Sequence, residues 1–399
     1  MSAADDAVAG APDGTSGGGP VFVLNAGSSS LKYQLVDPAT GTAFASGTVE
    51  RIGEPRSADG GEYIPDHEAA VRAALDRLEG TDADRPAACG HRVVHGGDRF
   101  DAATVIDDGV EAAIDELAAL APLHNPPNLQ GIRAARAVLS DVPHVAVFDT
   151  AFHRTIPAAA STYAIDAELA ERYAVRRYGF HGTSHQYVSR ATAEFLGRPL
   201  EQVKTIVLHL GNGASACAVD GGRSVETSMG LTPLEGLVMG TRSGDLDPAV
   251  IFHLHRQAGL GFDEIERMLN RGSGLKGLTG RGDMRDVQAA AAGGDERAAL
   301  ALAVVAHRIR RYVGAYTAQL GGLDAIAFTA GIGENDADLR LAALENLSHL
   351  GIAVDPERNA PRSKEPRRIS PDGSPVAVLV VPTNEELEIA RQTRAVVAA

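Results

Sequence analysis

The sequence predicts an α/β protein of two domains. Short apolar stretches alternate along the chain with longer segments of helical periodicity, as strands and helices do in α/β folds. At 399 residues, the chain is longer than a single hydrophobic core usually supports. Each half also opens with an apolar strand, a turn of small residues and a second strand, at 21–36 and at 205–219. That shared opening indicates an internal duplication.

The first domain is predicted at residues 21–150. It begins with a hairpin at 21–36 and ends with a short buried strand at 145–148 that leads into Asp149. Helices are predicted within it at 66–78, 110–120 and 128–139. Residues 1–20 are rich in Gly, Ala, Asp and Ser, so we expect them to form a disordered extension.

The second domain is predicted at residues 151–383. A hairpin at 205–219 and a strand at 325–330 supply its sheet. Its predicted helices lie at 166–173, 184–196, 248–257, 262–269, 296–320 and 336–350. A last helix opens behind Pro382-Thr383-Asn384, a strong start signal. We expect this segment, at about 384–399, to pack back on the first domain.

Composition limits the classes of function. A net charge of −15 argues against a nucleic-acid surface, which needs a basic face. The two cysteines, Cys89 and Cys217, form no C-x-x-C pair, so we expect no disulfide framework and a reducing cytoplasmic location. The sequence lacks both a run of 18 apolar residues and a signal-peptide pattern at its start, so neither a membrane span nor membrane association is expected.

Three turns of small residues, at 25–30, 211–213 and 331–335, follow apolar strands. Small side chains let backbone N–H groups approach phosphate oxygens closely. Three such turns therefore indicate that the protein binds a nucleotide from several sides, as a phosphotransferase does. The sequence has no P-loop motif. The formal G-x-G-x-x-G at 272–277 follows a predicted helix instead of a strand, so a flexible loop is the favoured interpretation there.

Charged side chains stand close to these turns and strand ends. Arg92, Arg242 and Arg285 lie on such loops, where a planar guanidinium could hold a carboxylate or phosphate. Taken singly, each could equally be a solvated surface residue. Asp149 closes an apolar strand, where α/β sheets place ligands, although a turn cap is the alternative. His181 and His185 have the i,i+4 spacing of a metal pair but lack the adjacent Glu of a zinc protease, so independent roles are favoured.

The chain resembles the acetate kinase family from Val21 to its C-terminus. The first matching motif is Asn25-Ala26-Gly27-Ser28-Ser29-Ser30-Leu31-Lys32. The other matching segments are 91–97, 124–126, 148–153, 177–185, 209–213, 239–248 and 331–335. The resemblance implies a two-domain actin-like ATPase fold of duplicated ribonuclease H-like domains, shared with sugar kinases, actin and heat-shock ATPases. It also implies a homodimer and the reversible reaction of ATP and acetate to ADP and acetyl phosphate.

The same resemblance assigns roles to individual residues. The positions that match nucleotide contacts are Lys32, His209, Leu210, Gly211, Asn212, Gly213, Asp283, Met284, Arg285, Gly331, Ile332, Gly333, Glu334 and Asn335. Asn25 and Glu385 match the positions for Mg²⁺, for which Mn²⁺ is a possible substitute. Arg92 matches the acetate contact, and the methyl pocket matches Val94, Leu123, Phe180 and Pro233. Asp149 matches the active-site acid or base, and His181 and Arg242 match the transition-state stabilisers.

Physical chemistry qualifies one of these roles. A carboxylic acid titrates near pH 4, so the acceptor is already ionised at pH 7 and needs no general base. We therefore expect Asp149 to orient magnesium-bound water or an arginine instead of accepting a proton. Two alternatives stay open from the sequence: a propionate or butyrate kinase with the same machinery, and an actin-like ATPase that acts on partners. The pair of Arg92 and Arg242 disfavours the latter, which needs no carboxylate clamp.

Overall fold

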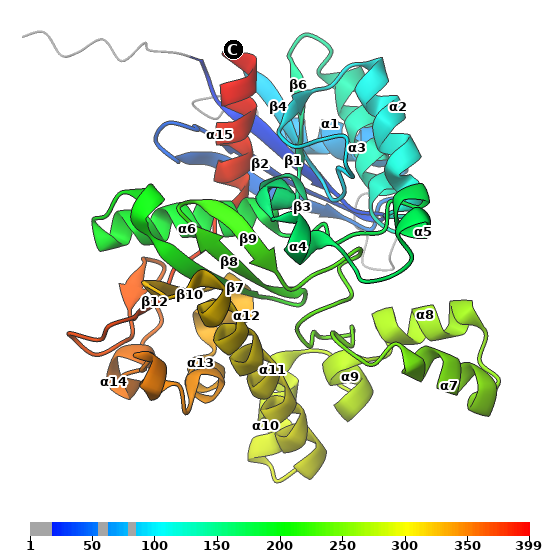
Figure 1. The fold of residues 1–399 in the computed structure, drawn as a ribbon. Coiled ribbons are helices and arrows are strands. Elements are labelled where there is room, and N and C mark those ends of the chain that lie inside the picture. The colour runs from blue at the N-terminus through cyan, green and yellow to red at the C-terminus, as the bar shows by residue number, and fades with distance from the viewer. Residues whose placement is uncertain (1–17, 55–62, 79–84) are drawn as a thin grey trace, which may run out of the picture.

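The computed structural model describes residues 18–54, 63–78 and 85–399, and these form two six-stranded sheets (Figure 1). The extension predicted at 1–20 lies almost entirely outside the described residues. Cys89 and Cys217 are buried and free. No helix within the described ranges has the length and apolar character needed to cross a bilayer.

The first sheet has the strand order β3-β2-β1-β4-β6-β5. Its strands are β1 (Val21–Ala26), β2 (Ser30–Val36), β3 (Ala43–Glu50), β4 (Ala88–Val93), β5 (Thr104–Val105) and β6 (His144–Phe148). The three leading strands form an antiparallel meander, whereas β1, β4 and β6 run parallel, and β5 returns antiparallel at the edge.

The second sheet has the order β11-β12-β10-β7-β8-β9. Its strands are β7 (Lys204–Leu210), β8 (Ala214–Asp220), β9 (Arg223–Thr227), β10 (Ala325–Thr329), β11 (Arg367–Arg368) and β12 (Ala377–Val380). The strands β7, β8 and β9 are antiparallel, β7, β10 and β12 are parallel, and β11 is an antiparallel edge strand. Order and direction therefore repeat those of the first sheet strand by strand, which confirms the predicted duplication.

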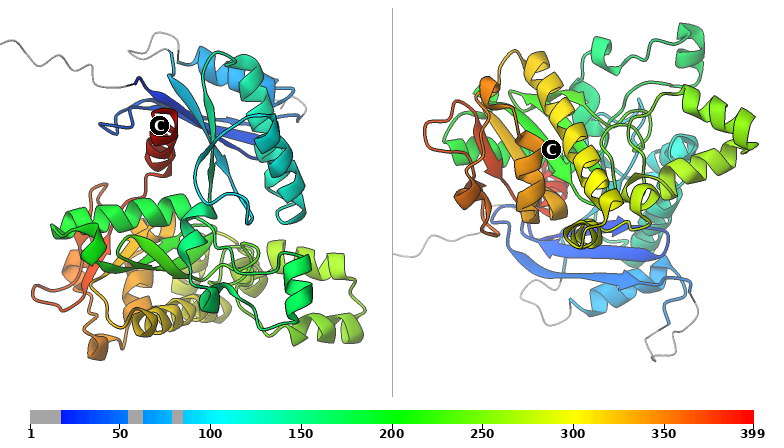
Figure 2. Two further views of the ribbon diagram at one scale, coloured as in Figure 1. Left: turned by 45° about the horizontal axis from the view of Figure 1, so that its top comes forward. Right: turned by 90° about the horizontal axis from the view of Figure 1, so that it is seen from below.

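Helices cover both faces of the first sheet (Figure 2). Those from the first half are α1 (His67–Asp76), α2 (Asp108–Glu116), the 3₁₀ turn η1 (Leu117–Ala119) and α3 (Asn125–Val138). Helices α1 and α3 share one buried cluster with Phe22 and Leu24 of β1. The opposite face is covered by α15 (Glu385–Val397), whose Leu387 and Ile389 are buried with Val21 and Val147.

The second sheet is enclosed in the same manner. On one face lies α6 (Gly182–Leu196), whose Val188 packs against Val207 and Ala327. On the other face the long helix α11 (Glu296–Leu320) contributes Val305, Ile309 and Val313 to the largest core cluster. The remaining elements are η2 (Ala151–Thr155), α4 (Ala158–Ser161), α5 (Ala167–Arg172), η3 (Leu200–Gln202), α7 (Ala249–Ala258), α8 (Phe262–Arg271), α9 (Gly274–Thr279), α10 (Met284–Ala292), α12 (Ala330–Asn335), α13 (Ala337–Leu344), η4 (Ser348–Leu350) and α14 (Pro356–Asn359).

Helices α6 and α15 meet between the two sheets, where Arg190 Nη1 lies 2.9 Å from Glu388 Oε2. This carboxylate is almost fully buried, with 1% of its side chain exposed. The two sheets are thus joined through α6, which packs on the second sheet, and α15, which packs on the first.

Some predictions from the sequence are wrong in detail. The helix predicted at 336–350 ends at Leu344, because Asn346 adopts a left-handed backbone with φ of 64°. The segment 331–335 is not an open turn: Ala330 turns the chain with φ of 64°, and the short helix α12 follows. The segment 272–277 is mostly helix α9 instead of a flexible loop.

Candidate active site

Two charged side chains meet where adjacent parallel strands of the first sheet end. Arg92 lies on β4, and Asp149 comes directly after β6. Arg92 Nε is 2.9 Å from Asp149 Oδ1, and Arg92 Nη2 is 2.6 Å from Oδ2, so the guanidinium grips the carboxylate with both arms. The Asp149 side chain is 1% exposed and that of Arg92 is 20% exposed, so part of the arginine side chain stays accessible. Burial raises the pKa of Asp149, and the adjacent Arg92 charge opposes that rise.

His181 is held beside this pair by the backbone. It precedes α6 and adopts a left-handed conformation with φ of 57°, which is uncommon for a residue other than glycine. Gly182 N donates to Asp149 O at 3.0 Å, and a Cβ atom at position 182 would lie 2.2 Å from that oxygen. Only glycine allows this approach, so the first turn of α6 is fixed to the end of β6.

The His181 ring stacks on His209 of β7, with 4.2 Å between centroids and 21° between planes. Burial, together with the charges of His209, Arg92, His185 and Arg242, lowers the pKa of His181 well below its ordinary value. A Cβ atom added to Gly213 would lie 3.4 Å from His181 Nε2 and 3.6 Å from Arg242 Nη2. Gly213 therefore lies close to both side chains. Arg242 is oriented by a hydrogen bond of 2.7 Å from its Nη1 to Pro233 O.

The segment before α15 closes the other side of this site. His209 Nδ1 lies 2.8 Å from Ser184 Oγ, which lies 2.9 Å from Thr383 Oγ1. Thr183 Oγ1 donates to Glu385 Oε2 at 3.3 Å, so α6 positions the first carboxylate of α15.

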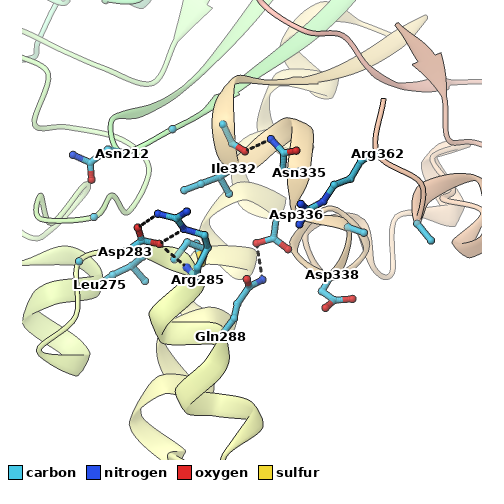
Figure 3. Close-up of a pocket in the computed structure, with 17 residues that line it drawn as sticks. Asn212, Leu275, Asp283, Arg285, Gln288, Ile332, Asn335, Asp336, Asp338 and Arg362 are labelled. Carbon is cyan, nitrogen blue, oxygen red and sulfur yellow. Dashed lines mark hydrogen bonds and ion pairs between the residues drawn. The ribbon is translucent and has the colours of Figure 1, made fainter. Parts of the chain in front are cut away.

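A cleft of about 620 Å³ lies in the second half of the chain, and its lining includes Gly211 and Asn212, which directly precede Gly213 (Figure 3). Its lining includes eight of the predicted nucleotide residues: Gly211, Asn212, Asp283, Met284, Arg285, Gly331, Ile332 and Asn335. Nine further lining residues were not predicted: Gly240, Leu275, Gly282, Gln288, Asp336, Ala337, Asp338, Ala360 and Arg362.

The walls of the cleft are set by close backbone packing and by hydrogen bonds. Gly240 N donates to Asn212 O at 3.2 Å, and a Cβ atom at position 240 would lie 2.2 Å from Asn212 Oδ1. Gln288 Nε2 donates to Asp336 Oδ2 at 2.7 Å across the floor seen in Figure 3. Arg285 is paired with Asp283 at 2.6 Å, and its side chain is 87% exposed.

Comparison with known proteins agrees with this geometry. A model of the acetokinase family matches residues 20–391. The chain belongs to the acetokinase family. The acetate kinase of Leifsonia xyli subsp. xyli is 66% identical over 394 residues, which cover 95% of this chain and 99% of that protein.

Solved structures give the same result for the fold. The acetate kinase of Porphyromonas gingivalis superposes with a TM-score of 0.89 at 40% identity, covering 95% of this chain and 100% of that one. A propionate kinase from Francisella tularensis subsp. tularensis superposes with a TM-score of 0.88, also at 40% identity, covering 94% and 99%. The predicted two-domain actin-like fold of the acetokinase family is thereby confirmed.

The remaining predicted residues surround the cleft or lie apart from it. Leu210 is buried in the sheet, Gly333 packs near Leu208 O, and Glu334 Oε1 accepts from Thr383 N at 3.2 Å. Lys32 is exposed on β2 and pairs in register with Asn25 of β1. Since Leu24 pairs with His91, Asn25 comes beside Arg92 at the same end of the sheet.

The residues predicted to form the methyl pocket differ in burial. Phe180 is 1% exposed, and Val94 packs against the core cluster that contains it. Leu123 is 53% exposed. Pro233 is partly buried and acts through its carbonyl on Arg242.

Two groups of residues could hold a cation. Asn25 and Glu385 offer oxygen ligands, which Mg²⁺ prefers, and Glu385 acts electrostatically on both Arg92 and Asp149. Cys89, His91 and His144 also gather in the first sheet. The two imidazoles are already hydrogen-bonded to each other at 2.9 Å, and that of His144 also to Leu139 O at 3.0 Å. The positive charge of Arg136 acts on both rings. We therefore interpret them as a neutral, hydrogen-bonded pair in the core and not as metal ligands.

Proposed function

We propose that this chain catalyses the reversible, Mg²⁺-dependent transfer of the γ-phosphoryl group of ATP to acetate. The observation that carries the proposal is that His181 Nε2 and Arg242 Nη2 both lie beside Gly213, two residues from Gly211 of the cleft lining. The charge of Arg92 also acts on His181. Transfer between two anions is limited by charge repulsion, and these donors reduce it.

The acceptor is activated by position alone. Acetate is ionised at pH 7, and Arg92, whose side chain is 20% exposed, would bind its carboxylate. Asp149 grips the other side of Arg92 through two hydrogen bonds, so its role is to orient the arginine. One acetate oxygen then forms a bond to the γ-phosphorus while the bond from phosphorus to the ADP oxygen breaks.

The donor side belongs to the second half of the chain. The cleft would hold ATP, and His181 and Arg242 would face the migrating phosphoryl group from either side of Gly213. Asn25 and Glu385 would hold Mg²⁺, which neutralises phosphate charge when bound. Closure of the two halves would exclude water, which competes with acetate for the phosphoryl group.

We also propose a homodimer formed through the helices of the second half. Exposed apolar side chains lie there on α7 and α8, which project together to one side of the second sheet (Figure 1). They include Val250, Phe252 and Phe262, with exposures from 39% to 61%. Apolar patches of this kind mark association surfaces.

The direct test traps the acyl phosphate. The protein is incubated with MgATP and acetate, and hydroxylamine converts acetyl phosphate to a hydroxamate that is read by colour. Hydroxamate formation that depends on both substrates is expected. ATP hydrolysis without hydroxamate would contradict the proposal and favour an ATPase that acts on partners.

The same assay resolves substrate preference. A family member whose structure superposes well here is named a propionate kinase, so the acid must be tested directly. One methylene changes binding by only about 1–3 kcal/mol, so modest preferences are expected. We expect kcat/KM to be highest for acetate, then propionate, then butyrate.

A further inference from the structure

Ser215 lies between His181, which precedes α6, and His185, which lies in the first turn of α6. It is fully buried on β8. Its Oγ is 2.9 Å from His181 Nδ1 and 2.7 Å from His185 Nε2. A hydroxyl has one proton to donate, so these two contacts constrain how the ring protons are distributed.

Both rings are neutral at pH 7. Burial and neighbouring charges lower the pKa of His181 and of His185 well below the ordinary value. The first turn of a helix also disfavours positive charge. Each ring therefore carries one proton, either on Nδ1 or on Nε2.

The surroundings of His185 Nδ1, the ring nitrogen that does not contact Ser215, decide which nitrogen of His185 carries the proton. Among the described residues, His185 Nδ1 is buried without a hydrogen-bond partner. A proton on that atom would be a buried donor with no acceptor, which is rare and costly. The His185 proton is thus on Nε2 and is donated to Ser215 Oγ. The hydroxyl group of Ser215 is then free to donate its hydrogen bond to His181 Nδ1. That nitrogen accepts through its lone pair, so it carries no proton.

We propose that Ser215 and His185 are positioning residues that fix His181 as the tautomer with its proton on Nε2. This inference rests on the proposed phosphoryl transfer for its purpose, although the tautomer itself can be observed without any reaction. The Nε2 edge of His181 faces the space beside Gly213 that Arg242 Nη2 also borders. With the proton on Nε2, that edge donates a hydrogen bond to a phosphoryl oxygen. In the other tautomer, it would present a lone pair to an anion.

The first test is spectroscopic. Long-range ¹H–¹⁵N correlation spectra of the full-length protein distinguish a protonated from an unprotonated ring nitrogen, and H181Q identifies the His181 signals. We expect an Nε2-protonated ring for both His181 and His185. An Nδ1-protonated His181 in the folded protein would overturn the proposal, whatever its activity.

The second test uses a matched pair of variants. Ser215→Ala removes the hydroxyl that links His185 to His181 by two hydrogen bonds, which we call the relay. Ser224→Ala removes a hydroxyl that is equally buried but hydrogen-bonded to His153 and Cys217. We expect Ser215→Ala to lower kcat about tenfold or more and to give mixed His181 tautomers, with little change in the KM for ATP. Ser224→Ala should retain the single tautomer.

A double variant separates positioning from structure. In His181→Gln, the amide nitrogen stands where Nε2 stood and needs no relay from Ser215. Adding Ser215→Ala to His181→Gln should therefore leave kcat unchanged within about twofold. A further tenfold loss in that background would show that Ser215 acts through the fold, and would overturn the relay. Wild-type protein that forms no acyl phosphate would refute the proposed function but not the tautomer.

Discussion

The two sheets of this molecule share one topology but carry different chemistry at the same positions. In the first sheet, the parallel strands β4 and β6 end in Arg92 and Asp149, which form a buried ion pair. In the second sheet, the equivalent strand β10 ends at Thr329 and leads into helix α12, whose Gly331 and Ile332 line the cleft. The first sheet thus carries charged side chains at its strand ends, whereas the second sheet leads into a short helix whose first residues line the cleft.

The turns that open the two sheets differ less. Both are built from small residues, at 26–30 between β1 and β2 and at 211–213 between β7 and β8. Only the second borders the cleft, because Gly211 and Asn212 face it. A duplicated fold thus places equivalent strand ends opposite each other, and the residues at those ends divide the work: the first half would bind the acid, and the second half would bind the nucleotide.

The largest effect expected from this division is the loss of Arg242, which belongs to the second half and lies near His181 beside Gly213. Arg242→Ala should lower kcat by about 10²–10³, since it removes a donor to the migrating phosphoryl group. The KM for acetate should change little. Steady-state rates by the hydroxamate assay check this result, with Arg281→Ala, an exposed arginine paired with Asp295, as the control. A pure rise in the KM for acetate would show that the division is wrong.

Much of this arrangement could be predicted from the sequence. The apolar runs indicated the hairpins 21–36 and 205–219 within a few residues, because β1, β7 and β8 are almost entirely buried and therefore mostly apolar. In β2, buried Leu31, Tyr33 and Leu35 alternate with polar residues. The helix Glu296–Leu320 matches its prediction at both ends, since Asp295 caps its N-terminus and Gly321 its C-terminus. The helix Glu385–Val397 lies within the predicted segment of about 384–399, and Asn384 caps its N-terminus. The strand β4 was missed because its sequence mixes Gly, His and Arg with apolar residues.

The site was less predictable than the fold. The family motifs predicted roles for Arg92, Asp149, His181 and Arg242, but no local pattern shows that Gly182 must touch Asp149 O. Gln288, Asp336 and Arg362 lie on helices or loops far apart in sequence and reach the cleft only through tertiary packing. Gln288 and Asp336 had one available signal, their proximity to the segments 283–285 and 331–335, and Arg362 had none.

The next effect tests the first half. Arg92→Ala should raise the KM for acetate about 10- to 100-fold, because a charged hydrogen bond contributes roughly 1.5–3 kcal/mol. It also leaves Asp149 buried without its partner, so the melting temperature should fall. Titration of acetate at saturating MgATP measures the first effect, and calorimetry measures the second.

Asp149→Asn sharpens the same comparison. The substitution keeps the shape of the side chain but weakens its grip on Arg92, so it should raise the KM for acetate by less than Arg92→Ala does. The dependence of the rate on Mg²⁺ concentration should shift little if Asp149 acts on the arginine. A large loss of Mg²⁺ affinity would instead assign Asp149 to the metal.

The smallest expected effect concerns the second half. There, an added methyl group should weaken ATP binding, just as removal of the Arg92 charge should weaken acetate binding in the first half. A Cβ atom at position 240 would lie 2.2 Å from Asn212 Oδ1 and 2.8 Å from Gly282 O, and Asn212 and Gly282 both line the cleft. Gly240→Ala should displace this wall and raise the KM for ATP roughly tenfold or less, because overpacking costs about 1–3 kcal/mol and part of that strain relaxes. The KM for acetate should stay within twofold of its wild-type value. Gly314→Ala is the matched control, since its Cβ would meet nothing within 4 Å on helix α11. An equal rise in both Michaelis constants for Gly240→Ala would mean that the two halves do not bind their substrates separately.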